Sequence, residues 1–114
     1  MKSITIANKA VQTVATTIPV PPSPAPATRI LLSASPSAKS RYICLKARNA
    51  AGGGGGTCYI GTANTVTATN FYYTAVVAGN FSTEIFGEKY LGELWAITSA
   101  GGNIDIKILA VEER

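Results

Sequence analysis

The segment RYICLKARNAAGGGGGTCYI, residues 41–60, decides the fold class. Its first part alternates polar and apolar residues, the pattern of a strand with one face in a core. Five consecutive glycines then remove side-chain packing and make the chain entropically costly to order, which predicts a loop. A second β-type run, Thr57–Ile60, follows this loop. We therefore predict two strands joined as a hairpin with a long glycine loop.

The two cysteines lie symmetrically in this predicted hairpin. If it folds about Ala51, Cys44 and Cys58 lie directly opposite, with Cβ atoms about 4.5–5.5 Å apart. A disulfide needs about 3.5–4.5 Å, so the pair is close to bonding reach. Free cysteines also pack as small hydrophobic residues, and a one-residue slip in the loop would part the pair to opposite faces. The sequence leaves two interpretations, a cross-strand thiol pair and two packed free thiols.

Composition indicates one domain with much neutral surface. A chain of 114 residues can bury an adequate core without metal or disulfide support. Hydrophobic residues make up 46% of it and charged residues only 14%, against a usual charged share of about 25%. So few charges leave neutral or apolar surface exposed, and such surface usually belongs to an interface.

The net charge of +4 is unevenly distributed along the chain. Residues 1–80 hold seven bases and no acid, whereas residues 81–114 hold six acids and three bases. Such a split favours pairing between subunits or with an acidic partner surface. Because the bases are not clustered with interleaved aromatic residues, nucleic-acid binding is an alternative and not the main expectation.

The first 27 residues predict an extended arm. Residues 3–18 are rich in Thr and Val, which favours an extended arm or an edge strand. Residues 19–26 (PVPPSPAP) hold five prolines, which predict a polyproline-type spacer. We expect an N-terminal arm over 1–27 and a β-sandwich domain over 28–114. Because we see no apolar signal-peptide region and no run near the ~20 residues of a membrane span, we expect synthesis in a cytosol.

Short β-type runs separated by turns continue to the end of the chain. Ile43, Leu45 and Ala47 are expected to face the core. Residues 103–111 carry an inward stripe, while Leu109 and Val111 place apolar groups on the opposite face, which favours a covering arm or a subunit contact there. Seven or eight short strands without a clear helix predict an all-β fold, a small antiparallel β-sandwich or barrel.

No pattern of catalytic or metal-binding residues is present. The chain has no histidine, which removes Ser-His-Asp and Cys-His nucleophile systems and the commonest metal ligand. Two cysteines alone cannot supply the four ligands of a zinc site. The run Gly52–Gly56 lacks the GxxxxGK[ST] frame of a phosphate-binding loop. We predict a non-enzymatic protein with no catalytic residues, no metal and no cofactor.

A series of short motifs resembles small β-sandwich modules of tailed-bacteriophage virion proteins. The resemblance covers roughly Thr28 to Glu112 and implies a head-decoration, head-fibre or tail-adaptor role without catalytic residues. The motifs that carry it are, in order, TRILL (28–32), RYICLKARN (41–49), YIG (59–61), VT (66–67), AG (78–79), GELWAI (92–97) and IKILAVE (106–112).

We therefore expect a structural protein of a tailed-phage virion. Its expected role is that of a capsid decoration or head-fibre component. It would be made in the host cytoplasm, form a homotrimer, and bind the major capsid protein or another virion protein. The expected partner-binding residues are Lys2, Lys9, Val11, Val14, Ile18, Leu109 and Val111.

Two alternatives remain open at this point. One is a tail or fibre module that binds a host-surface glycan, with Tyr42, Tyr72, Tyr73 and Trp95 stacking on sugar rings. The other is a nucleic-acid-binding β-barrel.

Overall fold

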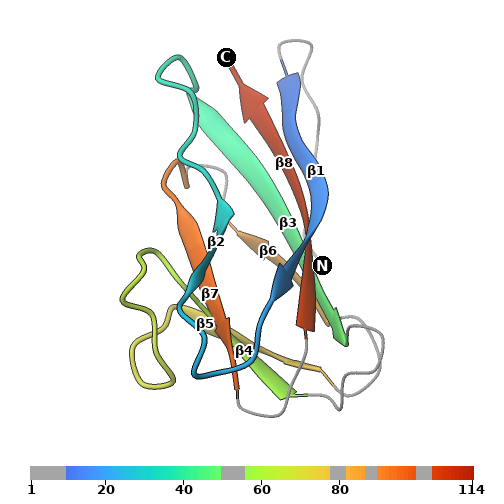
Figure 1. The fold of residues 1–114 in the computed structure, drawn as a ribbon. Helices are drawn as coiled ribbons and strands as arrows, with labels where there is room; N and C mark the ends of the chain where they lie inside the picture. Colours follow the sequence, from blue (N-terminus) through green and yellow to red (C-terminus); the bar gives the residue numbers. More distant parts are fainter. Residues whose placement is uncertain (1–9, 50–55, 78–81, 87–89, 100–103) are drawn as a thin grey trace.

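Eight strands form two antiparallel four-stranded sheets that pack face to face (Figure 1). The computed structural model describes residues 10–49, 56–77, 82–86, 90–99 and 104–114, and only the backbone of residues 10–16, 73, 75–77 and 82–86. The expectation of an all-β sandwich of seven or eight strands is confirmed. The strands are β1 (Ala10–Val20), β2 (Thr28–Leu31), β3 (Ser40–Asn49), β4 (Gly56–Gly61), β5 (Tyr73–Val77), β6 (Ser82–Phe86), β7 (Leu94–Thr98) and β8 (Ile104–Glu113).

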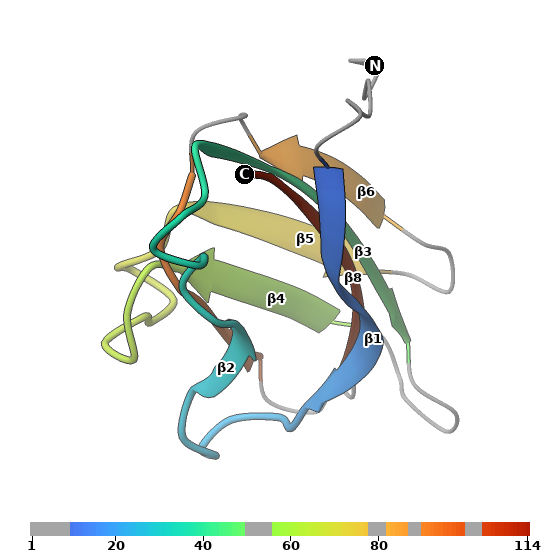
Figure 2. The same cartoon turned by 90° about the horizontal axis from the view of Figure 1, so that it is seen from above.

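The strand order defines the topology. Sheet A has the order β1-β8-β3-β6, and sheet B has the order β2-β7-β4-β5. The chain crosses between the sheets at every connection except the one from β4 to β5. Two four-stranded sheets connected in this way form a jelly roll, and Figure 2 shows the layers with β1 and β8 on one side and β4 and β5 on the other.

The predicted hairpin about the glycine run is wrong. β3 lies in sheet A between β8 and β6, whereas β4 lies in sheet B between β7 and β5. Cys44 is opposite Leu109 and Ile85, and Cys58 is opposite Thr98 and Ala75. Both thiols are free, so the cross-strand thiol pair is also wrong. The physical reason is that a long loop can lead into either sheet, and local alternation does not say which. The centre of the loop, residues 50–55, lies outside the described residues.

The expected boundary between an arm and a sandwich at residue 27 does not hold for β1. This strand pairs antiparallel with β8 from Ala10 to Val20, with one register shift between Gln12 and Val14. Val20 is 1% exposed and belongs to the core. Part of the proline-rich segment is also attached to the sandwich, because Pro22 forms an isolated bridge with Thr98. The sequence left two interpretations of residues 3–18, an extended arm and an edge strand. The pairing of β1 with β8 agrees with the edge strand.

The core lies between the two sheets and is built from alternating residues. In β3 the inward residues are Ile43, Leu45 and Ala47, as expected from the alternation. In β8 the predicted inward stripe, Ile104, Ile106, Ile108 and Ala110, is fully or almost fully buried. Burying these apolar side chains contributes about 25 cal/mol per Å² of area removed from water, so this interior is the main stabilising element.

β2 departs from simple alternation. Ile30 and Leu31 are both buried although they are neighbours, while Leu32 is 57% exposed. The register of β2 against β7 shifts between Arg29 and Leu31, and this bulge turns successive side chains toward the core. Strict alternation would place Ile30 and Leu31 on opposite faces, because alternation alone cannot reveal a bulge.

Candidate functional site

The first candidate surface is the outer edge of β1. Among the described strands, β1 has a neighbour on one side only, namely β8. It is the longest edge strand, with 11 residues against four or five in β2, β5 and β6. Its sequence, AVQTVATTIPV, contains no charged residue. An unpaired, uncharged edge presents backbone N–H and C=O groups to another chain. β1 has two features that limit such pairing, Pro19 and the register shift between Gln12 and Val14, but it carries no charge.

An apolar row crosses the outer face of sheet A beside this edge. We use the term for four residues that are opposite one another in register, Ala15, Leu109, Cys44 and Ile85. Leu109 is 37% exposed and Cys44 is half-buried on this face. The row is followed by a pair of exposed bases, Lys46 and Lys107. The outer face of sheet A therefore combines an apolar row with a small basic patch.

The predicted partner-binding residues are only partly brought together. Lys2 and Lys9 lie outside the described residues. The backbone of Val11 is opposite Glu112 and that of Val14 is opposite Ala110, so both occupy register positions of the core side of β8. Their side chains are not described.

The three predicted residues with described side chains differ in how far they are open to a partner. Ile18 packs against the core, because it is opposite the buried Ile106. Val111 is only 4% exposed, opposite Gln12 and Tyr42 in the neighbouring strands, so it does not form an open apolar surface. Leu109, in contrast, faces outward in the centre of the sheet.

A buried arginine closes one end of the sandwich. Arg41 is 1% exposed and donates hydrogen bonds to three backbone carbonyls. Its Nη1 donates to Leu32 O at 2.8 Å, its Nη2 to Gly92 O at 2.6 Å and its Nε to Tyr90 O at 3.3 Å. The side chain thus joins β3 of sheet A to the segments that flank β2 and β7 of sheet B. This role was not predicted from the sequence, although position 41 continues the inward alternation of 43, 45 and 47.

Glu112 is the acidic neighbour of this arginine. It is 3% exposed and lies opposite Arg41 in the register of β3 and β8. Its Oε2 accepts the Ser35 N–H at 3.2 Å, and its Oε1 accepts Arg114 Nε at 3.0 Å. Burial lowers the pKa of Arg41, an effect opposed by the charges of Glu112 and Tyr90. The guanidinium remains charged in proteins, so this end of the core contains a hydrogen-bonded ionic cluster.

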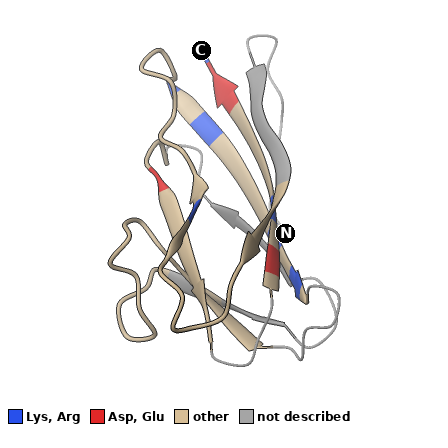
Figure 3. Cartoon of the chain, viewed as in Figure 1, with Lys and Arg blue, Asp and Glu red and all other residues tan. Residues whose placement is uncertain are grey.

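The uneven charge of the sequence is partly paired within one chain. Arg29 contacts Glu93 at 3.2 Å, and Arg48 lies 3.9 Å from Asp105. Figure 3 shows bases on β3 beside acids on β8. Both pairs join a base from the first part of the sequence to an acid from the last part. Some of the complementarity expected between subunits is therefore used inside the fold.

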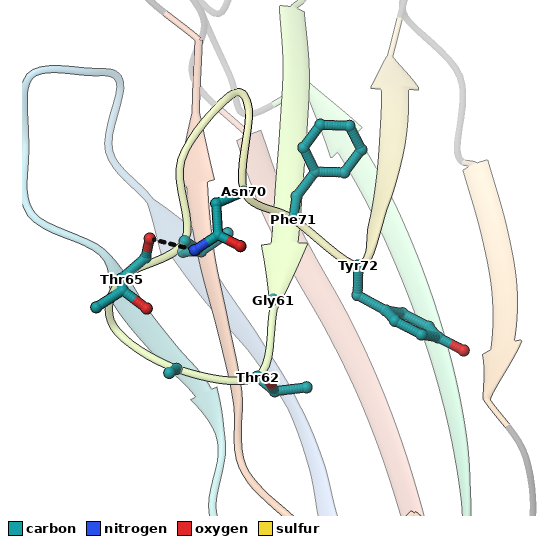
Figure 4. Close-up of a pocket in the computed structure, with 8 residues that line it drawn as sticks. Gly61, Thr62, Thr65, Asn70, Phe71 and Tyr72 are labelled. Carbon is teal, nitrogen blue, oxygen red and sulfur yellow. Dashed lines mark hydrogen bonds between the residues drawn. The ribbon is translucent and has the colours of Figure 1, made fainter.

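A small hollow lies at the loop between β4 and β5. We call residues 62–72 the β4–β5 loop; with Gly61 at the end of β4, it lines a cavity of about 240 Å³. Figure 4 shows Asn70 turned toward Thr65, with Phe71 and Tyr72 on the other side of the site. The side chains that line the hollow include Thr62, Thr65, Asn70, Phe71 and Tyr72.

The four aromatic residues singled out from the sequence have different surroundings. Tyr72 is 68% exposed, whereas Tyr42 and Trp95 are half-buried. The Arg29 guanidinium lies over the Trp95 ring at 5.9 Å. The side chain of Tyr73 is not described. Of the described members of this set, only Tyr72 lines the hollow, and it is joined there by Phe71, which the sequence analysis had not chosen.

No cluster of three or more His, Cys, Asp or Glu residues that could hold a metal ion occurs in the described part of the chain. Within the same residues, no helix is long and apolar enough to cross a membrane.

Comparison with known proteins finds a similar fold but no matching family. No family model matches the chain, and no curated protein matches it. One solved structure that does match comes from Bacillus endospore appendages, described as a novel family of disulfide-linked pili. The two chains are 16% identical with a TM-score of 0.50, and the match covers 99% of this chain and 97% of the other. At this identity the likeness shows that the two chains share a fold.

Proposed function

We propose that this protein is a non-enzymatic structural subunit that works by assembling with copies of itself and with a larger protein structure. The observation that carries the proposal is the outer edge of β1, a long uncharged strand with one neighbour among the described strands. Addition of a strand from another chain would satisfy its open backbone groups, which is a common mode of protein recognition.

The geometry favours a head-to-tail contact between copies. β1 and β6 form the two opposite edges of sheet A, so pairing β1 of one copy with β6 of the next would continue the sheet. Contacts of this kind close into a ring or extend into a filament, depending on the rotation between copies. A homotrimer is the closed case expected from the sequence. The apolar row would add an uncharged surface beside the joined edges.

The specific role that we propose is that of a tailed-phage virion protein, a capsid decoration or head-fibre component. It is supported by the motif resemblance over Thr28 to Glu112 and by a jelly-roll fold, which occurs widely in viral capsid proteins. The contact with the major capsid protein or another virion protein would use the same edge or the outer face of sheet A.

A variant of the β1 edge tests the assembly mechanism. Ala15→Lys with Thr17→Lys places two charges on the outer face at the edge, since these positions are opposite the exposed Leu109 and Lys107. Ser33→Lys with Ala68→Lys adds the same charge at exposed positions away from the strands. By light scattering, we expect the wild type and the control to form oligomers and the β1 variant to remain monomeric with an unchanged circular dichroism spectrum. Equal oligomer mass in all three proteins would contradict a β1 contact.

A second candidate role is that of a filament subunit. It is favoured by the shared fold with an appendage pilus structure over almost the full length of both chains. Immunogold electron microscopy with an antibody to this chain separates the two roles. Label on phage heads would support the virion role, whereas label along filaments on cells or spores would support the appendage role.

In a filament of the disulfide-linked kind, Cys44 is the thiol that could bond between copies. It is half-buried on the outer face of sheet A, while Cys58 is 0% exposed. Two Cys44 thiols would lose two protons and two electrons to an oxidant such as dioxygen and form one S–S bond. Electrophoresis without reductant would then show dimers for wild type and Cys58→Ala, and none for Cys44→Ala. If the oxidised wild type shows no dimers, a Cys44–Cys44 disulfide between copies is ruled out.

A further inference from the structure

We propose that the hollow at the β4–β5 loop binds one ring of a neutral carbohydrate. This inference does not depend on the assembly role, because the loop and the β1 edge lie on opposite sides of the molecule in both views (Figures 1 and 2). Three features of the loop support it: its internal hydrogen bonds, the chemistry of its lining and the exposure of its aromatic rings.

The loop is held in one shape by its own contacts. Thr67 Oγ1 accepts the backbone N–H groups of Thr69 at 3.2 Å and Asn70 at 2.9 Å. The Asn70 side chain donates from Nδ2 to Thr65 O at 3.2 Å. A site whose groups are fixed before the ligand arrives loses less entropy on binding.

The base of the loop is also anchored to the sandwich. Val66 is 5% exposed and packs against Gly61, where an added Cβ would come within 2.9 Å of Val66 Cγ2. The Tyr72 N–H donates to Ile60 O at 2.7 Å and fixes the other end of the loop. The middle of the loop and its C-terminal end are therefore both attached to β4.

The lining of the hollow is polar and uncharged. No Lys, Arg, Asp or Glu occurs among its eight lining residues. The hydroxyl groups of Thr62 and Thr65 make no hydrogen bond within the described part of the chain, and the Asn70 side chain still has its carbonyl oxygen to accept one. Such groups can donate to and accept from the hydroxyls of a sugar. The absence of charge in this lining disfavours phosphates and acidic or basic peptides.

Two aromatic rings provide the apolar part of the site. Tyr72 is 68% and Phe71 is 42% exposed, and they are two of the four exposed large hydrophobic residues among the side chains that the structure describes. Phe71 is held by Tyr59, with ring centres 5.2 Å apart and the planes tilted by 53°. A pyranose has both apolar C–H groups and polar hydroxyl groups. Its C–H groups can pack on the exposed rings while its hydroxyls form hydrogen bonds with the ordered polar groups beside them.

The volume limits the ligand to a small one. At about 240 Å³ the hollow is smaller than the roughly 300–1,000 Å³ of pockets that enclose drug-sized ligands. One sugar ring fits this size, with the rest of a longer glycan outside. A terminal hexose or N-acetylhexosamine of a surface polysaccharide is the ligand class that the geometry favours.

Saturation-transfer difference NMR on the full-length chain tests the site, because the method observes the ligand and tolerates large assemblies. The probes are the methyl glycosides of glucose, galactose, mannose and N-acetylglucosamine at millimolar concentration. We expect transfer to at least one glycoside, strongest at the C–H protons of one face of its ring. Replacement Tyr72→Ala should weaken binding by about tenfold through loss of stacking. Thr62→Val should weaken it by removing a hydroxyl with little change of shape.

The matched control is Leu32→Ala, which removes an exposed apolar side chain outside the hollow. It should bind like the wild type. All three variants change exposed residues, so their thermal unfolding should remain near that of the wild type.

Two results would overturn the proposal. One is the absence of transfer to all four glycosides, and the other is equal binding by Tyr72→Ala and Leu32→Ala. If the loop is instead a contact between copies of the chain, Tyr72→Ala should lower the oligomer mass in light scattering, and the glycosides should give no transfer. If the Ala15→Lys, Thr17→Lys variant assembles like the wild type, the proposed carbohydrate site is unaffected, because neither residue lines the hollow.

Discussion

At the residue scale, Arg41 is the side chain whose role is hardest to replace. Its three bonds to backbone carbonyls join the two sheets at one end, and Glu112 lies opposite it in the same buried layer. Lysine has the same charge but a single ammonium group, so it cannot reproduce the planar fork of donors that reaches three carbonyls.

We predict that Arg41→Met lowers the free energy of unfolding by about 3–5 kcal/mol, because it leaves three backbone carbonyls without their donor and removes the positive charge opposite the buried Glu112. Arg48→Met is the matched control, since the Arg48–Asp105 pair is 3.9 Å apart and Arg48 is exposed. Its loss should be below about 1 kcal/mol. Denaturant unfolding measures both values. Similar small losses in the two variants would show that the Arg41 cluster is not structural.

Cys58 makes stability depend on alkaline pH. Burial raises the pKa of this thiol from 9.0 to about 12, partly offset by its hydrogen bond with Thr98. Above pH 9 the unfolded chain loses the thiol proton while the folded chain keeps it. The unfolded state then binds fewer protons, so stability falls as pH rises toward 12.

We predict that the wild type loses up to about 1.4 kcal/mol more than Cys58→Ala between about pH 8 and about pH 10. The quantity to compare is the change with pH in each protein, since the smaller side chain has its own constant effect on stability. Tyr90, whose pKa is raised by burial, remains in both proteins and cancels in the comparison. Parallel pH profiles would mean that the Cys58 thiol ionises as easily in the folded state as in the unfolded one.

At the element scale, β1 is both part of the sandwich and an edge strand with a single neighbour among the described strands. It pairs with β8 over nearly its whole length and contributes Val20 to the core, so it is not a detachable arm. Its other edge is the surface on which the proposed assembly depends. One strand therefore couples stability to association.

Two truncations test the structural role of β1. Deletion of residues 1–27 removes β1 and should abolish the cooperative unfolding transition measured by circular dichroism, because Ile106 and Ile108 of β8 lose their neighbour. Deletion of residues 2–9 leaves β1 intact and should keep a melting temperature within a few degrees of the wild type. A folded product from the longer deletion would contradict the structural role given to β1.

The strands themselves were predictable from the sequence, whereas their partners were not. Alternation in residues 41–47 and 104–110 identified the inward faces of β3 and β8 correctly. Alternation is a local property, so it could not show that β3 and β4 belong to different sheets. The register shifts in β1 and β2 likewise have no signal in the sequence.

The polar sites were predictable only in part. Arg41 and Glu112 occupy positions that alternate in step with the inward-facing apolar residues of β3 and β8. They are also opposite each other in the register, so both positions indicate burial. The hollow is lined by residues of the Thr- and Asn-rich run at 62–70, a composition typical of exposed loops. Its shape depends on contacts within the loop, such as Asn70 with Thr65, and these have no periodic pattern.

At the scale of the whole molecule, charge and assembly are separable. Arg29–Glu93 and Arg48–Asp105 pair charges inside one chain, while β1 carries no charge at all. An assembly through uncharged edges depends little on ionic strength, unlike one between the basic and acidic parts of different copies.

We predict that the oligomer mass measured by light scattering stays the same between about 50 mM and about 500 mM NaCl, conditions between which exposed charges become strongly screened. Dissociation at high salt would instead indicate contacts between oppositely charged surfaces, with Lys46 and Lys107 as the first bases to replace.

The central position of β8 has a consequence for biosynthesis. β1 finds its sheet partner in residues 104–113, so a nascent chain cannot begin to complete sheet A until this segment has left the ribosome. During that interval β1 has both edges open and no charge to discourage contact with a neighbouring nascent chain. The rate of translation and the spacing of ribosomes on one message would then influence how much of the protein reaches the correct fold.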